Sequence, residues 1–122
     1  MQSQQYFAHS SRDGAPQPLA EHLCNVAECA SQFAKAFGAE EEAYLAGLLQ
    51  DLGKYGDLFQ KRLQGQASGV DHWSAGAWLA MQEHKAVAAA MAIWGHHLGL
   101  QRMDAASLSG SLAKFSDFLA QR

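Results

Sequence analysis

Apolar residues recur at intervals of three and four between Pro18 and Phe37, and polar residues fill the positions between them. This spacing is typical of one face of an amphipathic helix. Gly38, which tolerates a left-handed backbone, is a natural end for that helix. The pattern therefore predicts a helix whose apolar face consists of Leu19, Leu23, Val26, Ala27, Ala30, Phe33, Ala34 and Phe37.

Helical patterns continue along the rest of the chain. Three glutamates at 40–42 precede a nearly continuous apolar run that leads to Asp51, which predicts a second helix buried on most sides. A short amphipathic segment at 58–63 and a flexible loop at 65–69 follow, and then helices at about 71–83, 85–95 and 105–120. No alternating run of β-branched residues indicates a strand, so we predict an all-α bundle of five or six helices.

The composition is that of one modest domain. The 122 residues are 48 % hydrophobic, which is enough for a single core, and we expect residues 1–122 to form one domain. The formal net charge of -3 provides no overall attraction to nucleic acid. Lys54, Lys61 and Arg62 are the only local basic cluster, and we interpret it as a solvated face.

Cysteine usage and the N-terminal sequence favour a cytoplasmic protein. Cys24 and Cys29 lie about 140° apart around one predicted helix, which suits neither a disulfide nor a shared metal, so we interpret them as small buried residues. The first residues lack the basic start and apolar core of a signal peptide. No stretch has the length of a membrane span.

The histidines raise the possibility of a metal centre. Four of the six lie at helix ends or beside apolar stripes, namely His22, His72, His96 and His97. Imidazole and carboxylate are the usual protein ligands of manganese, iron, nickel, cobalt and zinc, and ligands on several helices can converge in a bundle. The alternative is that these histidines cap helices or lie on the surface.

Two local patterns bear on that centre. Adjacent histidines in a regular helix diverge by about 100°, but Gly95 and Gly99 predict a helix end here, where an irregular backbone can turn both rings of His96 and His97 inward. Lys54 follows Asp51 by three residues and shares its face if the helix persists. The lysine could keep the carboxylate ionised or contact a phosphate, and a solvated surface pair is the alternative.

Several blocks of sequence together resemble a known family. EHLCNVAECA, AGLLQDLGKYGDLFQKRL, DHWSAGAWLA and GHHLG occur in that order, and YFAHS precedes them. The combination resembles the HD-type nuclease domain of the CRISPR-associated interference nuclease of type I systems. That nuclease is the partner of a helicase and degrades invading DNA.

The resemblance implies an HD-superfamily helical bundle and a ligand set for one or two divalent transition metal ions. It assigns His22 and Asp51 to a first metal. It assigns four ligands to a second metal, namely Asp51, His72, His96 and His97. Asp51 would bridge the two ions. Lys54 would contact a phosphate or the bridging water, and the pair of ions would polarise a phosphodiester and supply hydroxide.

Two departures from the family pattern bear on activity. The histidine of the family's His-Asp pair falls on Gln50, whose amide oxygen is a weaker ligand than imidazole. The family also supplies a later aspartate, and Asp104 and Asp117 lie too close to the double histidine to be that residue. The chain is therefore a one-metal variant, a degenerate or C-terminally truncated module, or a fragment or substituted form of a longer nuclease.

The function that this resemblance implies is metal-dependent hydrolysis of phosphodiester bonds in single-stranded DNA during antiviral defence. The implied partners are single-stranded DNA, a helicase domain or subunit and the CRISPR surveillance complex, with no membrane. Two alternatives stay open. One is a catalytically degenerate module that docks to the helicase or the surveillance complex, and the other is an HD phosphohydrolase that acts on nucleotides.

Overall fold

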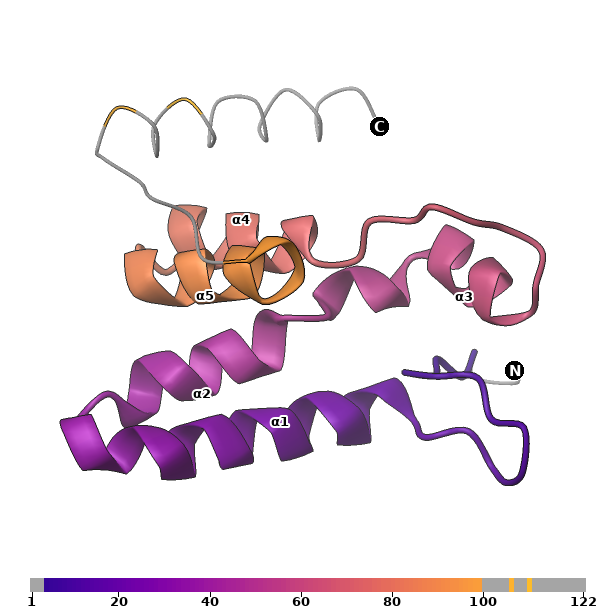
Figure 1. Cartoon of the computed structure of the whole chain (residues 1–122), viewed down its shortest axis with the longest axis horizontal. Helices are drawn as coiled ribbons and strands as arrows, with labels where there is room; N and C mark the ends of the chain where they lie inside the picture. Colours follow the sequence, from indigo (N-terminus) through magenta and orange to yellow (C-terminus); the bar gives the residue numbers. More distant parts are fainter. Residues whose placement is uncertain (1–3, 100–105, 107–109, 111–122) are drawn as a thin grey trace.

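The computed structural model describes residues 4–99 together with residues 106 and 110. This part of the chain contains five α-helices and two 3-10 turns, which Figure 1 shows in order: α1 (Leu19–Ala34), η1 (Lys35–Phe37), α2 (Glu40–Leu49), η2 (Leu52–Tyr55), α3 (Asp57–Leu63), α4 (Ser74–Gln82) and α5 (Val87–Leu98). The only extended pairing among the described residues is an isolated bridge between Phe7 and Pro18. The all-α prediction is confirmed.

Helices α1 and α2 form an antiparallel hairpin (Figure 1). Gly38 ends the first arm with a φ of 70°, as predicted, because glycine adopts the left-handed region without a steric penalty. The arms approach closely at Gly47, where an added Cβ would lie 2.6 Å from the Cα of Ala27. The hairpin therefore depends on a residue without a side chain at its contact point.

Helices α4 and α5 pack on the other face of α2 and enclose the main core (Figure 1). Its buried residues are Leu49, Ala77, Ala80, Met81, Ala89, Ala90 and Ile93. The closest approach is at Gly76, where an added Cβ would lie 1.8 Å from the carbonyl oxygen of Leu49. This contact brings the end of α2, and Asp51 just after it, beside the start of α4.

The apolar stripe of α1 differs from the prediction. The helix buries Leu19, Leu23, Ala27 and Ala34, whereas Phe33 is 80 % exposed and Phe37 is 75 % exposed. Phe33 lies beside the covered stripe rather than on it, and Phe37 falls in η1, where the chain leaves the helix. The prediction that both phenylalanines face the core is therefore wrong.

Cys24 and Cys29 were expected to be buried, and that expectation is also wrong. Both thiols are free and both residues are exposed. They lie off the stripe of α1 that α2 covers. Their separation around the helix agrees with the absence of a disulfide between them.

The boundaries of α4 and α5 shift by a few residues. Helix α4 begins at Ser74 rather than near Asp71, whose carboxylate accepts hydrogen bonds from the backbone N–H groups of Trp73 and Ser74. Helix α5 runs through both adjacent histidines to Leu98 and ends at Gly99, which has a φ of 85°. The predicted helix end near Gly95 is therefore wrong.

Two further predictions concern a C-terminal helix and membrane spans. Apart from residues 106 and 110, the helix expected at 105–120 lies outside the described residues, and so do Asp104 and Asp117. Among the helices that the structure describes, none combines the length and the apolar character needed to cross a membrane.

Candidate metal centre

The carboxylate of Asp51 is the centre of a cluster of polar side chains. It lies between α2 and η2 and is 5 % exposed. Its Oδ2 is 3.0 Å from Nζ of Lys54 and 3.3 Å from Nε2 of His22. Its Oδ1 is 3.4 Å from Nε2 of His72 and 3.7 Å from Nε2 of His97. Four residues that the sequence singled out thus meet at the carboxylate of a fifth, Asp51.

These side chains arrive from separate parts of the fold. His22 lies in the first turn of α1, His72 lies in the segment before α4, and His97 lies in the last turn of α5. The position of His72 depends on Gly53, whose N–H donates a hydrogen bond of 3.0 Å to the His72 carbonyl oxygen. A Cβ on Gly53 would lie 2.6 Å from that oxygen, so a glycine two residues after Asp51 permits the close approach.

Asp51, His72 and His97 have the chemistry and geometry of a metal site. Each offers a ligand atom, and these atoms lie within 4.8 Å of one another. The Oδ1 atom of Asp51 is buried and accepts no hydrogen bond from any described residue, although buried oxygens are normally satisfied. Two imidazoles and one carboxylate suit a divalent transition metal, so the residues present fit such an ion.

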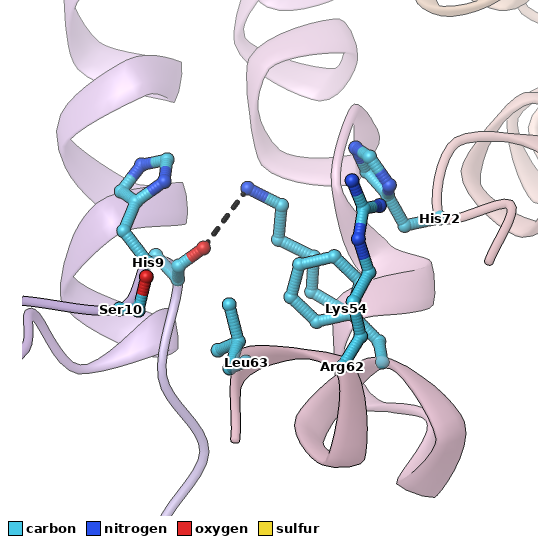
Figure 2. Close-up of a pocket in the computed structure, with 8 residues that line it drawn as sticks. His9, Ser10, Lys54, Arg62, Leu63 and His72 are labelled. Atoms are coloured by element: carbon cyan, nitrogen blue, oxygen red, sulfur yellow. Dashed lines mark hydrogen bonds between the residues drawn. The ribbon is translucent and has the colours of Figure 1, made fainter. Parts of the chain in front are cut away.

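Lys54 is buried beside the cluster. The residue is 5 % exposed, and its ammonium donates hydrogen bonds to Asp51 and, at 3.1 Å, to the Ala8 carbonyl oxygen (Figure 2). Burial alone would raise the pKa of Asp51, but the hydrogen bond and charge of Lys54, supported by His72 and His22, lower it below its ordinary value. The pair is thus not solvated, and Lys54 keeps the carboxylate ionised.

The pKa values of the two histidines that face Oδ1 are both lowered. The pKa of His72 is lowered mainly by burial, and the charges of His97 and Lys54 add to this, while Asp51 acts in the opposite direction. The pKa of His97 is also lowered, first by burial and then by His96. Because metals bind the neutral imidazole, these shifts favour ligation near neutral pH.

Comparison with known families places most of the chain in one family. A family model described as HD domain matches residues 19–120, most of the chain. The chain belongs to the HD domain family. HD domains are in general metal-dependent hydrolases, and this agrees with the cluster around Asp51. A search of curated proteins finds no match.

The family resemblance aligns the histidine of the His-Asp pair with Gln50. Its amide Nε2 lies 3.5 Å from Nε2 of His22. Among the described residues, the group of close ligand atoms consists of Asp51, His72 and His97, and His22 is not part of it. The assignment of His22 and Asp51 to a first metal stays a prediction.

The rings of the two adjacent histidines in this HD domain lie in different environments. His97 reaches Asp51 and stacks on Trp73, with ring centroids 4.5 Å apart and an interplanar angle of 26°. His96 Nδ1 donates a hydrogen bond of 2.6 Å to the Ile93 carbonyl oxygen within α5. The helix continues through both residues, so the structure brings His97 into the group and leaves His96 outside it.

Two residues that sequence reasoning did not assign also belong to this HD domain's site. Trp73 supports His97 from one side, and the ring centroid of His9 lies 5.1 Å from that of His22. The YFAHS block contains His9, and its resemblance to the family was the available signal. Gln60 holds this block in place, since its amide bonds both the Phe7 carbonyl oxygen and the Phe7 N–H.

Proposed function

We propose that this HD domain is a nuclease that hydrolyses phosphodiester bonds of single-stranded DNA with the help of a divalent transition metal, in antiviral CRISPR interference. The observation that carries the proposal is the buried Asp51 carboxylate, whose free Oδ1 faces His72 and His97. The order of sequence blocks supports the CRISPR context. The helicase and the surveillance complex are the proposed partners.

The proposed mechanism assigns separate tasks to the residues around the carboxylate. Asp51, His72 and His97 would hold the ion. His22 and His96 lie outside this described group, and only the family resemblance proposes them as further ligands. A bound divalent ion would supply Lewis acidity and lower the pKa of a coordinated water.

The remaining residues prepare the site. Lys54 keeps Asp51 ionised, and it offers positive charge on the side where a substrate phosphate would approach. Trp73 packs against His97 and restricts its ring to the orientation that faces Asp51. Both contacts fix the ligands before the substrate binds, which lowers the cost of reorganisation.

A second function, a docking module without catalysis, is favoured by Gln50. An amide in place of imidazole removes a strong ligand from the first metal position, and here that amide contacts His22 instead of leaving it free. An HD nucleotide phosphohydrolase is the third candidate. It would use the same ligands on a smaller phosphate ester.

Metal content and cleavage of circular single-stranded DNA test these functions together. Elemental analysis and an assay supplemented with manganese or nickel are applied to the chain, to Gln50→His, to Asp51→Ala and to His97→Ala. His84→Ala is the matched control, because His84 is exposed and contacts none of the ligands. We expect the chain and His84→Ala to retain metal and cut DNA, and Asp51→Ala and His97→Ala to do neither.

Other outcomes select the alternatives. If the chain binds no metal and cuts nothing while Gln50→His does both, the docking module is the correct function. If the chain hydrolyses mononucleotides but not circular DNA, the nucleotide phosphohydrolase is correct. Cleavage that survives Asp51→Ala would exclude the proposed site.

A further inference from the structure

A cavity of about 420 Å³ opens beside the metal group and is distinct from the space between its ligands. Figure 2 shows His9 and Ser10 on one wall and Arg62 and His72 on the other, with Lys54 between them. His72 is shared, since its Nε2 faces Asp51 while the residue lines the cavity. A ligand in the cavity would therefore lie next to anything bound at Asp51.

The charge of the cavity is suited to an anion. No carboxylate side chain is among the described residues that line it, whereas Lys54 and Arg62 contribute cations and Ser10 a hydroxyl. The ammonium of Lys54 is already engaged by Asp51 and Ala8. Arg62 is the remaining cation, and it forms no ion pair with any described carboxylate.

Arg62 is held in position by an aromatic side chain. Its guanidinium carbon lies 5.9 Å from the ring centroid of Phe59, which is buried. Figure 2 shows the guanidinium end directed toward His72. A planar guanidinium with free N–H donors matches the oxygens of a phosphate and can bind two of them at once.

The opposite wall is also held in place. The N-terminal segment that carries His9 and Ser10 is tied by Lys54 to the Ala8 carbonyl oxygen and by Gln60 to Phe7. Ala8 itself is fully buried. Donors on the two walls can therefore act on one ligand without first ordering a loop.

We infer that this cavity is a phosphate subsite, in which Arg62 is the principal contact and Ser10 and His9 bind from the opposite wall. The inference rests on the proposed function, because it assigns the subsite to a phosphodiester of single-stranded DNA next to the one attacked at Asp51. It also assigns a role to Arg62, which sequence analysis placed on a solvated face and which is exposed in the structure. A nucleotide phosphate shares this chemistry, so the test uses both probes.

The first measurement is binding of a fluorescein-labelled oligothymidylate to the full chain by fluorescence anisotropy, in EDTA so that no metal contributes. Arg62→Gln removes the charge, and Lys61→Gln is the matched control because Lys61 is the exposed neighbour on α3 outside the cavity. We expect Arg62→Gln to weaken binding about tenfold, as loss of a hydrogen bond to a charged group predicts. Lys61→Gln should change it less than about twofold.

Two further readouts separate a phosphate contact from a structural effect. The slope of log K against log salt should fall by about 0.7 in Arg62→Gln, the value for one phosphate contact on a single strand. Arg62→Lys should retain part of the affinity, because it keeps the charge and loses only the bidentate geometry. Circular dichroism spectra confirm that each variant is folded.

The second probe is dTMP, measured by isothermal titration calorimetry on the same variants. If Arg62→Gln and Lys61→Gln bind both probes equally, the subsite is refuted, and DNA cleavage by the chain would leave the proposed nuclease function intact. If the chain binds dTMP through Arg62 but does not bind the oligonucleotide, the subsite stands and the single-stranded DNA substrate is wrong. If the chain binds neither probe, the subsite is refuted.

Discussion

Lys54→Met removes the charge that neutralises Asp51 while keeping a side chain of similar length. Lys54 and Asp51 are each 5 % exposed, and their charged atoms are 3.0 Å apart. Removing one partner of such a pair leaves a buried carboxylate without its cation. The Ala8 carbonyl oxygen, in a residue with no exposed surface, also loses its donor. We therefore expect a large loss of stability in the metal-free protein.

The magnitude follows from these contacts. Breaking a buried ion pair costs about 3 to 5 kcal/mol, and the lower end applies because His22 and His72 still face the carboxylate. For 122 residues, an unfolding entropy of about 2.1 cal/mol/K per residue converts 3 kcal/mol into a decrease of about 12 °C in Tm. The pKa of Asp51 should rise, because burial is then opposed by fewer favourable contacts.

Thermal unfolding in EDTA, followed by circular dichroism at neutral pH, measures this effect. Lys61→Met is the control. Because Lys61 is exposed, its replacement should shift the free energy of unfolding by less than about 0.5 kcal/mol. The double variant Lys54→Met/Asp51→Asn should be less destabilised than the sum of the two single variants. A Tm for Lys54→Met within about 2 °C of the unmodified chain, or strict additivity in the double variant, would refute the argument.

Three further predictions concern the metal group, the core and pH. His97→Ala should weaken manganese binding, measured by calorimetry, by more than about tenfold, while His84→Ala should not change it. Gly76→Ala should lower the free energy of unfolding in urea by about 3 kcal/mol, because its Cβ would meet a backbone carbonyl oxygen of α2 at 1.8 Å. Gly95→Ala, with open space around its Cβ, should be neutral or stabilise by up to about 1 kcal/mol. The metal-free protein should lose stability as the pH falls below about 6.5, because the lowered pKa values of His72 and His97 let the unfolded chain take up more protons. If the urea midpoint of unfolding instead increased as the pH was lowered from about 7.5 to about 5.5, the predicted loss of stability would be wrong.

The sequence alone predicted the all-α class and pointed to a metal-dependent HD domain. Periodicity at three and four residues predicted a helix from Pro18 that stops at Gly38. The helix is confirmed as α1, which ends at Ala34, and η1 continues the chain to the stop at Gly38. Local spacing carries this information because a helix repeats every 3.6 residues whatever surrounds it. The ordered sequence blocks pointed to the HD superfamily, and the family match agrees.

Only the tertiary structure decided which side of each helix is covered. Phe33 has the spacing of a core residue, yet α2 covers the neighbouring stripe of α1 and leaves this ring exposed. His96 and His97 are equal candidates in the sequence. Because α5 continues through both, successive side chains are separated by about 100°, and only His97 joins the described group around Asp51.

Tertiary packing also explains which residues of the site the sequence could not assign. His9 and Arg62 are more than 50 positions apart along the chain, and neither has a local pattern that indicates a partner. The Gln60 and Lys54 bonds to the N-terminal segment bring them to opposite walls of one cavity. Residue types and helical repeats are local properties of a chain, whereas the convergence of ligands depends on how the helices pack. That packing brings backbone segments into close contact at Gly47, Gly53 and Gly76.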